Sequence, residues 1–143
     1  MSVTTIEIAA SPEQVWAVLA HAESYGEWVV GTNETSRADE SWPQPGSVLE
    51  YELGIGPLTV GDRTVVVQAD PPRLLVLRAE MDRLGSVSIR LELEPVGAGT
   101  RLTIDEEPIE GIAETLHTRL SDALLAYRNE EALRRLKRLA EAG

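Results

Sequence analysis

The stretch SPEQVW, residues Ser11 to Trp16, decides how the chain begins its fold. Ser11 offers a side-chain oxygen to the first turn of a helix, and Gln14 completes a capping box three residues later. Pro12 occupies the first helical position, where its missing N–H costs nothing. Directly before it, VTTIEIAA at residues 3–10 alternates as a half-buried strand does. The sequence therefore predicts a strand followed at once by a helix.

Most of the remaining chain is typical of strands. A second helical piece is expected in HAESYGEW, where Gly26 breaks the helix and Trp28 follows. Beyond it the turns WPQPG, GIGP, DPPR, DRLG and VGAG separate runs rich in Val, Leu, Ile and Thr. Short connections join antiparallel neighbours, so these runs predict a meander. With the first strand they make seven, the later ones at residues 32–39, 47–54, 58–69, 73–81, 86–95 and 100–107.

The predicted sheet has one covered face. In SVSIRLELEP, residues 86–95, apolar and polar side chains alternate without interruption. Such alternation is typical of an antiparallel sheet with one solvated side. The run at 58–69 is ambiguous in phase, and we expect a bulge there.

A long helix is expected to cover this face. Residues 116–142 are rich in Leu, Ala, Glu and Arg, without Gly or Pro, and are long enough to cross a sheet. Their apolar positions form two sets, so the two halves of the helix need not face the same surroundings. We predict an α+β helix-grip fold, a single domain over residues 1–143, in which a seven-stranded antiparallel curved sheet, two short N-terminal helices and one long C-terminal helix follow the order β-α-α-β6-α.

Composition excludes several functions. The chain has no cysteine, which rules out disulfides, thiolate metal sites and a cysteine nucleophile. Its net charge of -11 opposes binding to nucleic acid and to anionic membranes. The basic cluster LRRLKR, residues 133–138, suits the end of a helix. Without a signal segment or a membrane-length apolar run, we expect a cytoplasmic protein with no membrane insertion.

Several stretches resemble one known superfamily, and together they cover the whole chain. They are SPEQVW, YGEW, PQPGS, DPPRLLVLRAE, LELEPVGAGTRLT and EALRRLKRLAE. In this order they resemble the START-like (SRPBCC, Bet v 1-like) superfamily, in particular its bacterial polyketide cyclase/dehydrase-type members. The resemblance implies the same helix-grip fold and a deep, mostly apolar cavity that binds lipids, polyketides, hormones or similar molecules. Members that are enzymes, such as aromatase/cyclases, add a few polar groups to that cavity.

The sequence contains no strong motif for metal binding, nucleophilic catalysis or phosphate binding. His21 and His117 are far apart and have no ligand spacing around them, so we expect no metal site and no cofactor. No G-x-S-x-G nucleophile motif is present. GIGPLTVG at residues 54–61 lacks the spacing of a phosphate loop and is interpreted as a hairpin turn.

The candidate ligand-binding residues are those expected on the covered face. Trp28 and Tyr51 carry polar ring atoms that need a partner when buried. Glu106 follows Leu102 and Ile104 in phase, and is the first candidate for an acid in the cavity, unless the strand has already frayed there. Arg63 would meet Glu106 only in one phase of its strand. The predicted set is Trp28, Tyr51, Leu53, Ile55, Leu77, Met81, Ile89, Leu91, Ile104, Glu106, Ile109, Leu116, Leu120 and Leu124.

Other aromatic and polar residues have less specific interpretations. Trp16 is expected in the core under the first helix, and Trp42 is expected to pack on Pro43 in a turn. Polar residues continue one stripe of the C-terminal helix and are candidates to line the cavity: Thr118, Ser121, Asp122 and Asn129.

Three functions remain open on this sequence. The first is a carrier of a small hydrophobic molecule, a monomer or weak homodimer. The second is a polyketide cyclase/aromatase-type enzyme in which Tyr51, Glu106 and a helix-borne hydroxyl orient the substrate and move protons. The third is a protein-interaction or toxin–antitoxin role that uses the second apolar face of the long helix.

The turn order predicts where a ligand enters. Successive turns of a meander alternate between the two ends of the sheet, which brings GIGP, DRLG and EPIEG together at one end. That end carries apolar side chains that turns do not ordinarily need. We therefore expect ligands to enter past Ile55, Met81 and Ile109, while Leu133 and Leu136 pack solidly at the other end.

Overall fold

The computed structural model describes residues 2–29, 32–55, 58–81, 85–110 and 119–142. Positions 2, 26, 32–36, 53–55, 58–60, 110 and 119–128 are described by their backbone alone. The elements in chain order are β1 (Ser2–Ile8), α1 (Pro12–Ala20), the 3-10 helix η1 (Ala22–Ser24), α2 (Tyr25–Trp28), β2 (Thr32–Ala38), β3 (Val48–Ile55), β4 (Leu58–Asp70), β5 (Leu74–Met81), β6 (Gly85–Val96), β7 (Gly99–Glu110) and α4 (Arg119–Ala142).

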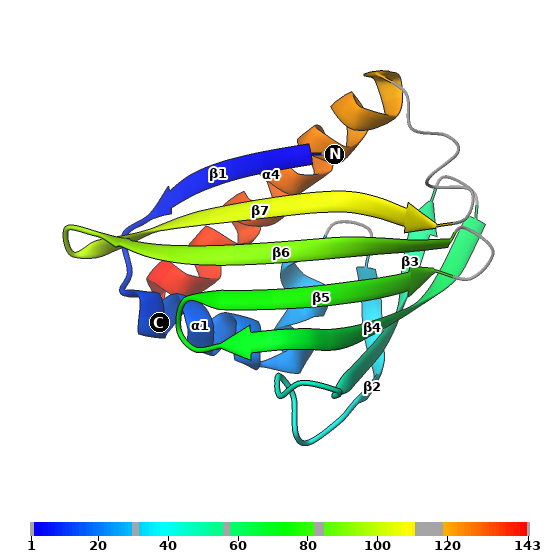
Figure 1. Cartoon of the computed structure of the whole chain (residues 1–143), viewed down its shortest axis with the longest axis horizontal. Helices are drawn as coiled ribbons and strands as arrows, with labels where there is room; N and C mark the ends of the chain where they lie inside the picture. The colour runs from blue at the N-terminus through cyan, green and yellow to red at the C-terminus, as the bar shows by residue number, and fades with distance from the viewer. Residues whose placement is uncertain (1, 30–31, 56–57, 82–84, 111–118, 143) are drawn as a thin grey trace.

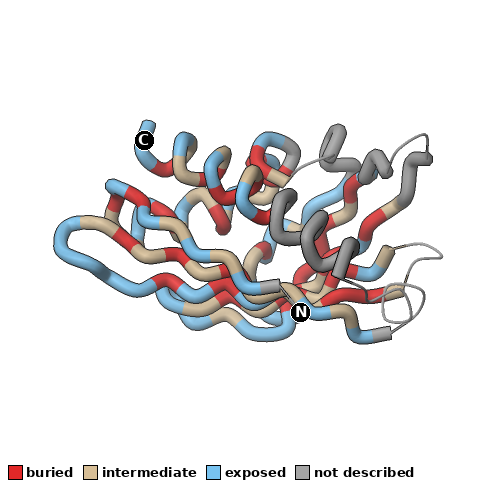
Figure 2. Tube along the Cα trace, turned by 90° about the horizontal axis from the view of Figure 1, so that it is seen from above, coloured by how far each residue is buried: buried red, intermediate tan, exposed pale blue. Residues whose placement is uncertain are grey.

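The strands form one antiparallel sheet in the order β1-β7-β6-β5-β4-β3-β2. Figure 1 shows the sheet curving around α4, with β1 beside β7. In Figure 2 the helices lie on one side of the sheet as a second layer. The predicted seven antiparallel strands are therefore confirmed, as is the closing helix on the covered face. The predicted residues 116–118 of that helix lie outside the described residues.

The start of α1 follows the predicted capping box. The backbone N–H of Gln14 donates to Ser11 Oγ at 3.2 Å, and the N–H of Ser11 donates to Gln14 Oε1 at 2.9 Å. The two bonds satisfy N–H groups that lack partners within the helix. The cap fixes the direction in which α1 leaves β1. The helix then packs against α4, β6 and β7.

The second helical piece differs from the expectation. It consists of η1 and the four-residue α2, and Gly26 lies inside α2 instead of breaking it. The prediction that Gly26 ends the helix is wrong because Tyr25 and Trp28 anchor α2 on both sides of the glycine, each buried in the core. Such tertiary packing outweighs the roughly 1 kcal/mol that a glycine costs inside a helix.

The bulge expected in residues 58–69 is present in β4. The pairing with β5 shifts between Val66 and Gln68. Before the shift, Asp62, Thr64 and Val66 are buried on the covered face, while Arg63 is exposed and lies 3.7 Å from the Glu80 carboxylate on the outer face. The possibility that Arg63 faces inward to meet Glu106 is therefore wrong.

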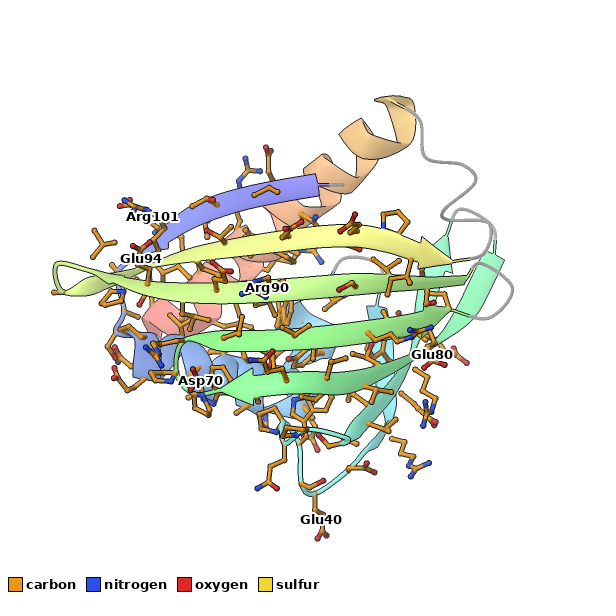
Figure 3. The ribbon with its side chains drawn as sticks, viewed as in Figure 1. Glu40, Asp70, Glu80, Arg90, Glu94 and Arg101 are labelled. Carbon is orange, nitrogen blue, oxygen red and sulfur yellow. The ribbon has the colours of Figure 1, made fainter. Side chains whose placement is uncertain are left out.

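Charged residues occupy the outer face of the sheet. Figure 3 shows Arg90, Glu94 and Arg101 over β6 and β7, on the side turned away from α4. Arg101 lies 3.1 Å from Glu7 and 3.7 Å from Glu94 in an exposed network. Exposed pairs of this kind contribute little to stability, so the network on this face is not what holds the fold together.

The C-terminal half of α4 packs tightly, as predicted. Leu133 and Leu136 are 0% exposed. Lys137 Nζ donates to the carbonyl of Glu7 at 2.8 Å, and Glu141 Oε2 accepts from the N–H of Ala9 at 2.7 Å. These bonds hold the end of α4 against the end of β1. None of the described helices is both long and apolar enough to cross a membrane.

Candidate functional site

Three aromatic side chains form a cluster beside the C-terminal end of α1. The Tyr25 ring lies 4.7 Å from the Trp28 ring and 5.5 Å from the Trp42 ring, the latter in an edge-to-face arrangement. All three residues are buried. Trp16 is half-buried against the same core, as an edge residue rather than its centre. The interpretation of Trp42 as a turn residue packing on Pro43 is therefore incomplete, because its indole belongs to the core.

Two rings of this cluster bind the same carbonyl oxygen. The Tyr25 hydroxyl donates to Leu19 O at 2.9 Å, and Trp42 Nε1 donates to it at 3.1 Å. Leu19 is in the last turn of α1, where carbonyl groups have no partner within the helix. Burial raises the pKa of Tyr25 well above its usual value, and nearby Tyr51 raises it further. Tyr25 is thus a neutral donor with a structural role.

The indole N–H of Trp28 is different. Trp28 is 4% exposed, and its Nε1 has no hydrogen-bond partner among the described residues. A buried donor without a partner costs about 1–3 kcal/mol. Such groups are few in native proteins, and each calls for an explanation.

A hydrogen-bonded chain crosses from β3 to β4 on the covered face. The Thr64 hydroxyl donates to Asp62 Oδ1 at 2.8 Å, and the Tyr51 hydroxyl lies 3.3 Å from Thr64 Oγ1. Because Thr64 uses its one proton on Asp62, Tyr51 is the donor of the second bond. Asp62 is 5% exposed and is the one buried carboxylate among the described side chains. This inward-facing acid was not predicted from the sequence.

The hairpin between β3 and β4 explains the position of Asp62. Ile55 lies opposite Leu58, as the hairpin interpretation of GIGPLTVG requires, and that register places Tyr51 opposite Asp62. Side chains directly opposite each other in an antiparallel pair point to the same face. Counting back from a two-residue turn would therefore have identified Asp62, since Tyr51 was already assigned to the covered face.

Glu106 lies on the covered face as predicted. It follows the buried Leu102 and Ile104 in phase and is half-buried. The alternative that the strand has frayed there is wrong, because β7 continues to Glu110. Asp62 and Glu106 are three strand spacings apart, about 14 Å across the sheet. They are also offset along the strands, because the pairing places Glu106 level with Val66 and not with Asp62. They do not form a paired-carboxylate site.

The remaining predicted site residues fall into three groups. Leu77, Leu91 and Ile104 are buried on the covered face, and Met81 and Ile89 are half-buried beside them. Ile109 is 38% exposed near the end of β7. The side chains of Leu53, Ile55, Leu120 and Leu124, and all of Leu116, lie outside the described residues. That any of these residues touches a ligand stays a prediction.

The polar residues expected along α4 are likewise only partly described. Asn129 is buried, whereas the side chains of Ser121 and Asp122, and all of Thr118, lie outside the described residues. The apolar helix face on which a protein-interaction role depended lies in the same part of the chain. Both expectations stay predictions.

The described cations lie on the surface. All ten Lys and Arg side chains that the structure describes are at least 36% exposed. The same part of the chain contains no group of three or more His, Asp or Glu that could hold a metal ion. The described interior therefore offers hydrogen bonds and apolar surface, and no positive charge.

The ends of the strands are arranged as the turn order predicted. The end of β3, the start of β4, the end of β5, the start of β6 and the end of β7 lie at one end of the sheet (Figure 1). The β4–β5 and β6–β7 connections lie at the opposite end. Tyr51, Asp62 and Met81 form one cross-strand row near the first end.

The chain matches one protein family over nearly its whole length. Residues 2–141 match the family described as "Polyketide cyclase / dehydrase and lipid transport". No curated protein matches at a significant level.

Solved structures share the fold. A Rhodobacter sphaeroides protein is 26% identical, with a TM-score of 0.72 over 98% of this chain and 93% of that one. The ZhuI aromatase/cyclase from Streptomyces sp. R1128 is 17% identical, with a TM-score of 0.78 over 97% and 92% of the two chains. Ara h 8.0201 is 11% identical, with a TM-score of 0.74 over 99% of each. The curved sheet around a long helix is consistent with the helix-grip fold, while the short N-terminal helices follow that pattern only roughly.

Proposed function

Since this chain belongs to the polyketide cyclase/dehydrase and lipid transport family, we propose that it binds a small hydrophobic molecule between the concave face of the sheet and α4. The observation that carries the proposal is the buried chain from Tyr51 through Thr64 to Asp62 among apolar side chains. Burying a carboxylate is expensive, and stability alone does not require one here. A polar group placed in apolar surroundings is typical of a ligand site.

Affinity and orientation come from different residues in this proposal. Leu77, Leu91 and Ile104 offer apolar surface, which contributes about 25 cal/mol per Å² removed from water. The Tyr51–Thr64–Asp62 chain fixes how a ligand's polar group is placed, because its hydrogen bonds have a defined direction. Ligands enter past Ile55, Met81 and Ile109, at the end of the sheet where β3 turns into β4.

A titration with Nile red, a neutral hydrophobic dye whose fluorescence rises in apolar surroundings, tests the binding site. We expect saturable binding by the wild type. Leu120→Trp should weaken it at least tenfold, because the larger ring would occupy part of the proposed binding site. Val96→Trp, in the hairpin at the opposite end, is the matched control and should bind Nile red as the wild type does. Loss of binding in Val96→Trp but not in Leu120→Trp would mean that the ligand binds at the opposite end of the sheet from the one proposed.

A cyclase-type activity is the second candidate, and Asp62 is the observation that favours it. A buried carboxylate that accepts a hydrogen bond from Thr64 can take up a proton from a ligand held beside it. Tyr51 and Glu106, the pair expected from the sequence, are separated by β4, β5 and β6, so Asp62 replaces Glu106 in this role.

The intramolecular aldol condensation of 2,6-heptanedione, which releases water, provides a model reaction for this candidate. Wild-type protein should accelerate it and Asp62→Asn should not, while both bind Nile red equally. Equal rates with and without protein would reject the enzyme and leave the carrier.

A further inference from the structure

The cluster of Tyr25, Trp28 and Trp42 contains three polar ring atoms, and two of them share one acceptor. Tyr25 Oη and Trp42 Nε1 both donate to Leu19 O, whereas Trp28 Nε1 has no partner among the described residues. Two of the three donors thus have an acceptor in the protein, and the buried N–H of Trp28 has none among the described residues. A bound molecule that brings an acceptor would complete the cluster.

Trp28 is positioned beside the proposed ligand site. α2, which ends at Trp28, packs against both α4 and β2. The Tyr25 ring lies 4.7 Å from the Trp28 ring, and Tyr25, Trp28 and Tyr51 belong to one cluster of buried side chains. The unpaired N–H therefore lies on the helical side of the interior, and the Tyr51–Thr64–Asp62 chain lies on the sheet side.

The charge of the interior decides which kind of ligand group can accept the hydrogen bond from Trp28. A ligand carboxylate or phosphate at Trp28 would enter an interior that already contains the buried carboxylate of Asp62, and every Lys and Arg side chain in the described part of the chain is on the surface. Burying an anion without a counter-charge costs far more than one hydrogen bond returns. A neutral carbonyl oxygen accepts the hydrogen bond without that cost.

We propose that the ligand is an uncharged molecule whose carbonyl oxygen accepts a hydrogen bond from Trp28 Nε1, so that Trp28 selects neutral carbonyl compounds over both hydrocarbons and carboxylates. This inference rests on the proposed function, since it names the class of molecule held at that site. It goes beyond the apolar cavity expected from the sequence, because a free fatty acid or an anionic dye is then a poor ligand.

Three planar naphthalenes of nearly equal shape separate these classes. They are 2-acetylnaphthalene, a ketone; 2-isopropenylnaphthalene, which replaces the oxygen by a methylene group; and 2-naphthoate, which carries a negative charge. Each is titrated against the wild-type protein with Nile red bound, and displacement gives its affinity. We expect the ketone to bind about tenfold more tightly than the alkene, as one hydrogen bond to a buried donor provides. The carboxylate should be the weakest of the three.

Tryptophan variants assign the effect to one residue. Trp28→Phe should bind the ketone and the alkene within threefold of each other. Trp16→Phe is the matched control, because Trp16 is half-buried on α1 and donates no described bond to this cluster, and it should keep the tenfold preference. If Trp28→Phe does not fold, the indole N–H signals of the wild type replace it. The chain has three tryptophans, and the Trp16 and Trp42 variants identify the third signal, which the ketone should shift downfield.

The outcomes separate the inference from the proposed function. Ketone preference that is lost in Trp28→Phe supports both. If a buried water accepts the Trp28 bond instead of a ligand, the ketone and the alkene bind alike, which overturns the inference and leaves hydrophobic binding standing. Tighter binding of 2-naphthoate, or a ketone preference that survives in Trp28→Phe, also overturns the inference. Failure of Nile red and all three probes to bind overturns the proposed function itself.

Discussion

Two regions of the interior differ in the polarity of their buried side chains. The packed end, defined as Ile8, Leu93, Leu102, Leu133 and Leu136, contains only aliphatic side chains, none more than 3% exposed. The polar region, defined as Trp28, Tyr51, Asp62 and Thr64, is equally buried but contains a carboxylate and an unpaired indole N–H. The first arrangement is what stability requires. The second is costly for stability, which is why we assign it to binding.

Truncation at the packed end should have the largest effect on stability. Leu136→Ala removes a fully buried side chain of α4 and should lower the free energy of unfolding by about 2–5 kcal/mol. Leu136→Met, which keeps the volume, should cost less than about 1.5 kcal/mol. Urea unfolding measures both. Under conditions where Leu136→Ala remains folded, it should bind Nile red as the wild type does. If the folded variant loses Nile red binding, the ligand binds at the packed end and not at the proposed site.

Removal of one hydroxyl in the polar region should have a moderate effect. Thr64→Val keeps the shape but removes one hydrogen bond to Asp62 and one from Tyr51. We expect a loss of about 1–3 kcal/mol in the free energy of unfolding at pH 7. Thr64→Ser retains the hydroxyl and should recover part of this loss. A valine variant as stable as the wild type would mean that the hydrogen-bonded chain is not formed.

The aromatic cluster should respond to alkaline pH. Tyr25→Phe removes the hydrogen bond to Leu19 O and should cost about 0.5–1.5 kcal/mol at pH 7. Because the pKa of Tyr25 is raised in the folded protein, the unfolded chain loses this proton first, so stability falls as the pH rises above about 10. Urea unfolding between pH 9 and 11 should therefore show a steeper decline for the wild type than for Tyr25→Phe. Equal slopes would contradict the buried, neutral hydroxyl.

The smallest effect is expected where α4 meets β1. The Glu141 carboxylate accepts bonds from Lys137 and from the Ala9 N–H, and these lower its pKa. Its contribution is thus present at neutral pH and disappears as the pH falls through the range where this carboxylate takes up a proton. Glu141→Gln should slightly lower Tm at pH 7 and make no difference at pH 2. If the difference in Tm between the wild type and Glu141→Gln grew as the pH falls, the ionised carboxylate would be destabilising, which would contradict this prediction.

Local patterns predicted the framework of the fold. The Ser11–Gln14 capping box, the strand alternation and the bulge near Val66 depend on residues close together in the chain or on simple periodicity. Glu106 was assigned to the covered face for the same reason, since β7 pairs with β6 without a shift from Leu102 to Pro108. Such features are determined by backbone geometry alone, so they could be predicted.

The polar region could be predicted only in part. Asp62 was missed because β4 mixes polar and apolar residues, and its phase follows from pairing with Tyr51 rather than from its own pattern. The two bonds to Leu19 O join residues on different elements, and one spans 23 positions. The unpaired N–H of Trp28 is a property of the packed interior as a whole. No local pattern encodes these contacts.

The central claim is that a ligand occupies the polar region and not the packed end. An NMR titration of isotope-labelled wild-type protein with 2-acetylnaphthalene tests it most directly, because backbone amide signals report on each region separately. The account predicts saturable shifts at Tyr51, Asp62 and Thr64 and at the Trp28 indole N–H, with little change at Leu93, Leu102 and Leu133. Shifts concentrated at those three leucines, with the polar region unmoved, would contradict it.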